Sequence, residues 1–187
     1  MAASPAEVIR PLRRVEYDEL VRLGVFQDER VELIDGAIYQ MSPIGRPHNF
    51  AVQELTELLV LALHGRAKVR PQMSYAASEL SEPEPDLMVT PLRDWSRQQA
   101  NEALLLIEVA ESSLAYDRGR KLRLYATCAV PEYWIVNIPD ACIEVHTQPE
   151  GSAYAKTEKF ERGQKIRLSA FPEVEVRVSD VFVRPRE

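Results

Sequence analysis

The chain has 187 residues, of which 45% are hydrophobic and 28% are charged, and its formal net charge is −6. This length and composition predict one soluble globular domain with a substantial core, and no apolar run approaches the roughly 18 residues of a membrane-spanning helix. The negative charge argues against nucleic-acid binding through bulk charge alone, although an acidic site that holds cations can still meet phosphates.

The N-terminal residues indicate a cytoplasmic protein, because residues 1–11 lack a cationic start followed by an apolar stretch. We expect residues 1–14 to form an N-terminal arm and residues 15–187 to form a single domain. The two cysteines, Cys128 and Cys142, have neither the spacing of a zinc site nor the density of a disulfide scaffold. They predict packing roles in a reducing compartment.

The first predicted elements are a short helix, a hairpin and a longer helix. They cover residues 17–24, 30–42 and 49–64. Gly24 is the stop signal of the short helix, and Asp35-Gly36 is a strong two-residue turn signal for the hairpin. The longer helix shows apolar side chains at helical spacing and ends at Gly65.

The rest of the chain predicts a mixed sheet and a second long helix. The expected strands cover residues 68–76, 87–90, 104–110, 132–137, 142–147, 154–160, 165–168 and 174–178. The second helix covers residues 114–128, with Ser113 as its expected N-cap. Tyr133 and Trp134 alternate along one strand, so we expect at most one of them to face the core. The fold class is therefore α/β in a mixed α+β form, with a C-terminal antiparallel meander.

Two carboxylates stand in or beside apolar strands. Asp86 follows Pro85 at the start of one strand, and Glu108 interrupts another. Because an unpaired buried charge costs several kcal/mol, such a group usually has a partner or a metal. Carboxylate and carbonyl oxygens are the ligands that hard divalent cations prefer, so we predict that Asp86, Glu108 and the backbone carbonyl of Val109 hold Mg²⁺ or Mn²⁺. Lys121 would orient the attacking water or stabilise negative charge.

Several segments together resemble one known family. They are the hairpin at residues 31–36, Met41-Ser42-Pro43 with His48, Pro85-Asp86, Ile107-Glu108-Val109, and a long block at residues 116–136. These segments are similar to the Uma2-like family (DUF820) of the PD-(D/E)XK nuclease superfamily, and the similarity runs from about residue 17 to 182. One departure concerns the superfamily's lysine, because the third position of the motif at Glu108 is Ala110 and the lysine stands at Lys121 in the helix.

The resemblance implies a restriction-endonuclease-like fold and a metal-dependent endonuclease acting on phosphodiester bonds, with DNA as the partner. It also implies a homodimer and no membrane partner. The catalytic set it implies is Asp86, Glu108, Lys121 and Glu32, with Glu32 as a further metal ligand. His48, Asp117 and Tyr125 would be accessory residues.

Each of these residues also has a structural interpretation. Asp86 could cap a turn, Glu108 could pair with an arginine, and Glu32 could form a salt bridge. Asp117, Lys121 and Tyr125 are four residues apart, so Lys121 could simply pair with Asp117, or Asp117 could orient it. Tyr125 could be a packing residue with a polar tip, and His48 could cap the helix that begins near residue 49.

Two other functions remain open at this point. One is a catalytically silent relative that uses the same fold to bind nucleic acid or a partner protein. The other is a glycosidase in which two carboxylates act as acid and base. Metal binding separates both from the nuclease, because a silent module need not bind a metal and glycoside cleavage does not require one.

Overall fold

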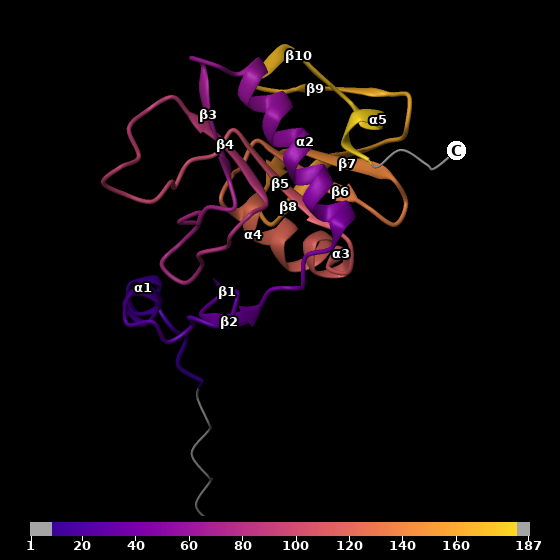
Figure 1. Ribbon diagram of the computed structural model, residues 1–187. Coiled ribbons are helices and arrows are strands. Elements are labelled where there is room, and N and C mark those ends of the chain that lie inside the picture. The colour runs from indigo at the N-terminus through magenta and orange to yellow at the C-terminus, as the bar shows by residue number, and fades with distance from the viewer. Residues whose placement is uncertain (1–8, 183–187) are drawn as a thin grey trace, which may run out of the picture. The chain divides into compact units, whose positions relative to one another are not determined.

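The computed structural model describes residues 9–182 of the chain (Figure 1). They fall into two compact units, which we describe separately. The hairpin unit comprises Met1–Met41 and Ala76–Pro83, and the sheet unit comprises Ser42–Tyr75 and Glu84–Glu187. Residues 1–8 of the expected N-terminal arm lie outside the described residues. The division into one arm and one domain stays a prediction.

The hairpin unit contains the first predicted helix and hairpin. Its elements are α1 (Arg14–Arg22), β1 (Val31–Ile34) and β2 (Ala37–Gln40), and the two strands pair antiparallel. Asp35 and Gly36 have φ angles of 52° and 76°. Positive φ at both central positions is what the tightest hairpin turns require, which is why Asp-Gly predicted this turn correctly. Glu32 lies in β1.

The sheet unit is built on a six-stranded mixed sheet with strand order β3-β4-β5-β6-β7-β8. Its strands are β3 (Ala67–Pro71), β4 (Leu87–Pro91), β5 (Leu105–Ala110), β6 (Glu132–Asn137), β7 (Cys142–Glu150) and β8 (Ala153–Phe160). The β5–β6 pair is parallel and the other neighbours are antiparallel. The remaining strands, β9 (Lys165–Leu168) and β10 (Phe171–Arg177), form a separate hairpin, followed by the short helix α5 (Val178–Val181).

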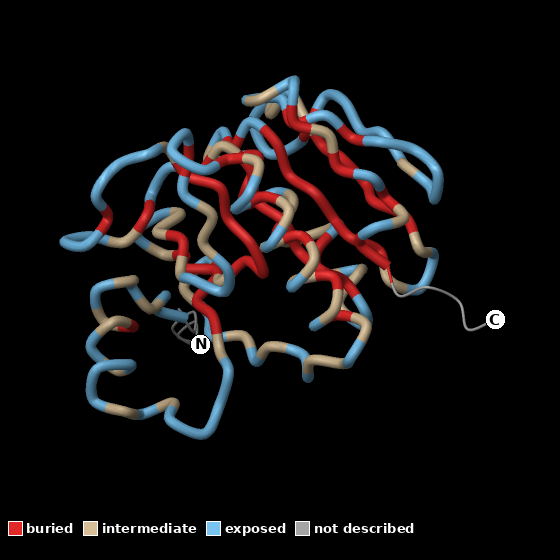
Figure 2. Tube along the Cα trace, turned by 45° about the horizontal axis from the view of Figure 1, so that its top comes forward, coloured by how far each residue is buried: buried red, intermediate tan, exposed pale blue. Residues whose placement is uncertain are grey.

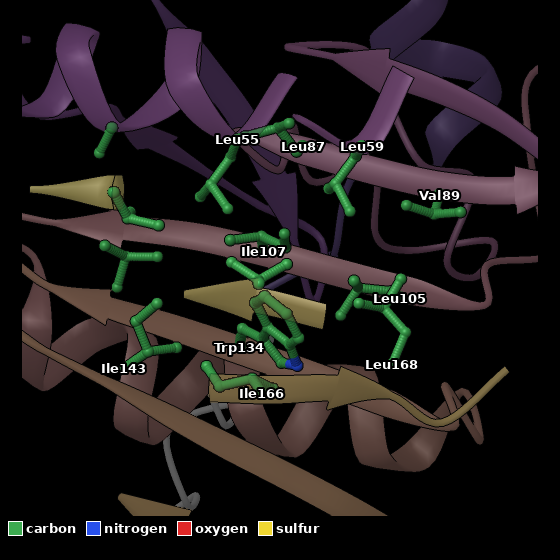
Figure 3. Packing of buried hydrophobic residues seen from close by; sticks show 14 of the residues in the cluster. Leu55, Leu59, Leu87, Val89, Leu105, Ile107, Trp134, Ile143, Ile166 and Leu168 are labelled. Atoms are coloured by element: carbon green, nitrogen blue, oxygen red, sulfur yellow. The ribbon is translucent and has the colours of Figure 1, made fainter. Parts of the chain in front are cut away.

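Helix α2 (Arg46–Ala62) covers one face of this sheet. Leu55 and Leu59 of the helix belong to one buried cluster with Leu87, Ile107 and Trp134 of the strands (Figure 3). The helix begins at Arg46 rather than at residue 49, so Pro47 lies in its first turn. Proline is tolerated there, because the first backbone nitrogens of a helix have no intrahelical hydrogen-bond partner. None of the described helices is long and apolar enough to cross a membrane.

The central strands are buried on both faces (Figure 2). Tyr133 and Trp134 are both fully buried, so the expectation that at most one of them faces the core was wrong. Trp134 packs on the α2 side, while the ring of Tyr133 lies 5.0 Å from that of Tyr125, in the helical segment on the other side. A strand between two helical layers has two buried faces, so alternation cannot identify a single core side.

The second long helix forms as a chain of three pieces. They are α3 (Leu114–Tyr116), the π-helical turn η1 (Asp117–Lys121) and α4 (Leu122–Thr127). Ser113 stands at the N-cap position, as expected, but its side chain makes no capping hydrogen bond to a backbone N–H. Its hydroxyl lies 2.6 Å from Oδ2 of Asp117 and donates a hydrogen bond to it. A π-turn holds one residue more than an α-turn, and such turns are frequent at functional sites.

A buried carboxylate joins the sheet to the β9–β10 hairpin. Glu132 in β6 is 1% exposed, and it accepts hydrogen bonds of 2.7 Å from Nε1 of Trp134 and from the backbone N–H of Ser169. Burial raises the pKa of Glu132, and the two hydrogen bonds only partly oppose that rise. Glu132 was not among the candidate residues predicted from the sequence, and its interactions are structural.

We expect Glu132→Ala to lower the free energy of unfolding by about 2–4 kcal/mol, because the buried indole N–H of Trp134 loses its acceptor at roughly 1–3 kcal/mol and the part-buried hydrogen bond from Ser169 adds roughly 1 kcal/mol. Urea denaturation of the variant and the parent measures the difference. The control is Glu150→Ala at the exposed end of β7, which should stay within about 0.5 kcal/mol of the parent. A Glu132→Ala protein as stable as the parent would show that the carboxylate does not hold the hairpin.

Candidate active site

Asp86 stands directly before β4, where both of its carboxylate oxygens meet protein groups. Oδ1 lies 2.9 Å from Nε2 of His48, and Oδ2 accepts a 2.8 Å hydrogen bond from the backbone N–H of Val109. The aspartate and the histidine are each 7% exposed. A buried carboxylate with an amide and an imidazole partner has part of its desolvation cost offset, which is how this charge is accommodated at the strand end.

His48 is therefore a partner of Asp86 and not a helix cap. It lies inside the first turn of α2, and the N-cap position belongs to Gly45. Its Nδ1 atom is buried and has no hydrogen-bond partner among the described residues. The position of the histidine follows from the early start of α2, which brings the first helical turn to the end of β4.

Glu108 is at the centre of a second group of buried polar side chains. Its Oε1 atom accepts hydrogen bonds from Nζ of Lys121 at 2.9 Å and from the hydroxyl of Tyr125 at 2.7 Å. The glutamate and the lysine are 4% and 3% exposed, and the tyrosine is fully buried. The structural alternative for Tyr125, packing alone, does not account for this hydrogen bond. The lysine of the helix thus reaches the strand carboxylate, as the resemblance implied.

The π-turn carries the donors that reach Glu108. Lys121 is the last residue of η1, and Tyr125 follows one turn later in α4. Nζ of Lys121 also lies 5.8 Å from the centre of the Tyr116 ring, which is within the range of a cation–π interaction. Two donors from successive turns thereby converge on a single oxygen atom.

Asp117 lies at the start of the same π-turn and is 2% exposed. Its Oδ2 accepts the hydrogen bond from Ser113, and its backbone carbonyl accepts one of 3.3 Å from the hydroxyl of Tyr133. The pKa of Tyr133 is raised, first by burial and then by the negative charges of Asp117 and Glu108. That Asp117 orients Lys121 stays a prediction.

The two strand carboxylates reach the same end of the sheet. Leu87 of β4 is paired with Ile107 of β5 in an antiparallel register. Asp86 precedes Leu87 and Glu108 follows Ile107, so the two carboxylate residues lie opposite each other. The chemistry of this donor set fits a hard divalent cation, because Mg²⁺ retains several waters and is often held by only one or two carboxylates. Among residues 9–182, no group of three or more His, Cys, Asp or Glu side chains is arranged to hold a metal ion. The roles of Glu32 and of the Val109 carbonyl as ligands stay predictions.

An ion pair that was not predicted from the sequence fixes the π-turn to the sheet. Nε and Nη2 of Arg118 lie 2.9 and 2.5 Å from the two carboxylate oxygens of Glu144 in β7, and Asn137 donates to the same carboxylate at 3.2 Å. Burial raises the pKa of Glu144, but the hydrogen bonds from Arg118 and Asn137 outweigh it and the pKa is lowered. The signal was available, because this glutamate interrupts an apolar strand as Glu108 does.

Comparisons with known proteins agree on a family and a fold. The family model Uma2, described as "Putative restriction endonuclease", matches residues 15–179. The crystal structure of a putative nuclease belonging to DUF820 from Anabaena variabilis ATCC 29413 is similar, with a TM-score of 0.71 and 17% identity over 92% of this chain and 98% of that one. No curated protein matches the chain. The restriction-endonuclease-like fold expected from the sequence is thereby confirmed.

Breaking the Glu108–Lys121 pair should be costly. We expect Lys121→Met to lower the free energy of unfolding by about 3–5 kcal/mol, because it leaves a buried carboxylate without its cation. Adding Glu108→Gln should cost less than the sum of the two single variants, with a coupling of about 1 kcal/mol or more. Chemical denaturation of the parent, both single variants and the double variant measures this cycle. Strictly additive costs would argue against a direct pair.

The Arg118–Glu144 pair should make stability depend on pH. Because the folded pKa of Glu144 lies below its ordinary value of 4.5, the pair stabilises the protein above that value, and the stability is lost as the pH falls through the lowered pKa. Glu144→Gln should thus differ most from the parent near neutral pH and progressively less below pH 4.5. Denaturation over a pH series measures the difference, with Glu150→Gln as the exposed control. A difference that does not change with pH would contradict this assignment.

Proposed function

The chain belongs to the Uma2 family, described as "Putative restriction endonuclease", and we propose on this premise that it is a metal-dependent endonuclease that hydrolyses phosphodiester bonds in DNA. The observation that carries the proposal is the pair of buried carboxylates on adjoining strands, one of which accepts hydrogen bonds from a buried lysine and a tyrosine. A group of buried ionisable residues is a candidate functional site.

The proposed ligands are Asp86 and Glu108, with the carbonyl of Val109 and the carboxylate of Glu32 completing the set. A bound Mg²⁺ or Mn²⁺ ion would neutralise charge at the phosphate and lower the pKa of a bound water. In the hydrolysis, the water oxygen bonds to phosphorus while one ester P–O bond breaks. The products are a phosphate monoester and a hydroxyl group.

The remaining side chains would orient the ligands and the water. His48 holds the carboxylate of Asp86 through a contact of 2.9 Å, and the Val109 N–H fixes its other oxygen. Tyr125 holds Glu108 in place. The ammonium of Lys121 is the positive group that would position the water or stabilise charge developing on the phosphate. Histidine and tyrosine partners of this kind typically contribute 10- to 100-fold to metal affinity or activity.

The homodimer and the cytoplasmic location implied by the resemblance belong to the same proposal. A two-fold pair of sites would let the two strands of a duplex be cut in one complex. The exposed edge of the C-terminal strands offers one candidate contact between the copies.

A silent, binding-only protein is the second candidate. The observation that favours it is that both oxygens of Asp86 and Oε1 of Glu108 already have protein partners. In such a protein the same groups would stabilise the sheet and no ion would be needed.

The deciding experiment is cleavage of a pool of plasmid and single-stranded DNA with Mg²⁺ or Mn²⁺, with chelator in a parallel reaction. We expect cutting by the parent only when metal is present. Asp86→Asn and Glu108→Gln should each lose about 100-fold or more in rate, because each removes a charged ligand of the proposed metal ion. Lys121→Met should lose rate while keeping its affinity for Mn²⁺, which is measured by calorimetry.

The matched control is Glu150→Gln, which removes an exposed carboxylate of β7 and should cut as the parent does. Circular dichroism checks that each variant is folded. Full Mn²⁺ affinity in both Asp86→Asn and Glu108→Gln would refute the site assignment. No cutting by the parent with any metal or substrate would favour the binding-only candidate.

A further inference from the structure

A basic pocket lies at the β3 edge of the six-stranded sheet. It has a volume of about 620 Å³, and its lining includes Lys68 and Arg70 of β3 and Arg93, Asp94 and Trp95 of the segment after β4. The pocket therefore gathers three cations and one carboxylate in a chain whose net charge is −6. Such a local excess of positive charge attracts anions even when the protein as a whole is acidic.

In the described part of the chain, two of the three cations form no salt bridge, although the charge of Lys68 contributes, after the hydrogen bonds from Ser96, to the lowered pKa of Asp94. Among the described residues, neither Lys68 nor Arg70 forms a salt bridge, and Nε of Arg70 is buried without a hydrogen-bond partner. Arg93 is bound to Glu102 at 2.8 Å. The single lining carboxylate, Asp94, accepts a hydrogen bond from the N–H of Ser96. The lysine and the arginine of β3 are thus available to an anion from solution.

Trp95 orders the arginine side chains. Its ring is 8% exposed, and its Nε1 donates to the carbonyl of Pro91 at 3.3 Å. The guanidinium carbons of Arg93 and Arg70 lie 5.1 and 6.0 Å from the ring centre. Cation–π contacts of this kind reduce the freedom of the arginines without neutralising them. The donors are consequently partly ordered before any ligand arrives.

The strand register places Lys68 and Arg70 on the same sheet face as Glu108. Arg70 is paired with Met88, and Met88 with Leu106. Directly paired residues project to the same face, and so do residues two apart on one strand, which adds Lys68 and Glu108. Arg70 in β3 is two strands away from β5, and Glu108 lies two residues along β5 from the position level with Arg70. The backbones of the two residues are therefore on the order of 10 Å apart.

We propose that the Lys68–Arg70–Arg93 pocket binds a backbone phosphate of the nucleic acid whose phosphodiester is cleaved at Glu108. The inference rests on the proposed function, and it adds a binding site outside the cleavage site. Phosphates follow one another at about 3.4 Å along each strand of a duplex axis, so the contacted phosphate lies a few nucleotides from the cleaved bond. Planar guanidinium groups match phosphate oxygens in pairs, whereas lysine contributes a point charge.

The test measures binding separately from cutting. Fluorescence anisotropy of labelled single-stranded and duplex DNA is followed in chelator, from about 50 to 200 mM salt. The pocket variants are Lys68→Gln/Arg70→Gln and the single change Lys68→Glu, which reverses a charge at an exposed position and spares the fold. The control is Lys156→Gln/Lys159→Gln on β8, at the opposite edge of the sheet, which removes the same number of cations.

We expect the pocket double variant to bind about 10-fold or more weakly than the parent. Its plot of log affinity against log salt should be shallower by about 0.9 for each lost contact on a duplex, or about 0.7 on a single strand. Lys68→Glu should shift both values in the same direction, and the β8 control should match the parent.

Two results would overturn the inference. They are pocket variants with the parent's affinity and salt slope, and a parent that binds no DNA at low salt. Cutting with Mg²⁺ is assayed in parallel, so a parent that binds through the pocket without cutting would contradict the nuclease proposal alone.

Discussion

The hydrogen bonds from Lys121 and Tyr125 to Oε1 of Glu108 are the interaction on which the arrangement of the sheet unit depends. A carboxylate in the middle of a fully buried strand is tolerated only with such partners. They come from the helical segment on the face of the sheet opposite α2, and the same contacts fix that segment against the strands. The side chains of Glu108, Lys121 and Tyr125 therefore both stabilise the fold and belong to the proposed catalytic site.

Much of the fold could be predicted from the sequence because its signals are local. The Asp35-Gly36 turn and the helical spacing in residues 49–64 depend on near neighbours along the chain, and both elements were found. Element ends were less accurate. The helix start at Arg46 and the extension of β7 to Glu150 depend on neighbouring segments in space. The double burial of Tyr133 and Trp134 depends on a second helical layer, which periodicity within one strand does not report.

The two strand carboxylates of the candidate site were predicted from the sequence, but the side chains that contact them were predicted only in part. A charge in an apolar strand is visible in the sequence, which is why Asp86 and Glu108 were found. The same signal at Glu132 and Glu144 was not used, and the structure gives both of them structural partners. Which buried carboxylate has a lysine and which has an arginine or a backbone amide depends on long-range packing. Burial of a charge therefore locates candidates without separating structural from chemical roles.

The parallel pairing of β5 and β6 has a consequence for how the protein acquires its site. Parallel neighbours need a crossover connection, and here the crossover is the segment α3–η1–α4 that supplies Lys121 and Tyr125. The contacts to Glu108 form only when this connection has closed, while His48 must arrive from a helix that lies earlier in the chain. Non-local contacts of this kind form slowly, because the entropy of loop closure is lost before the contacts can stabilise the chain. A growing chain in which this crossover segment has not yet packed on β5 therefore lacks the contacts to Glu108.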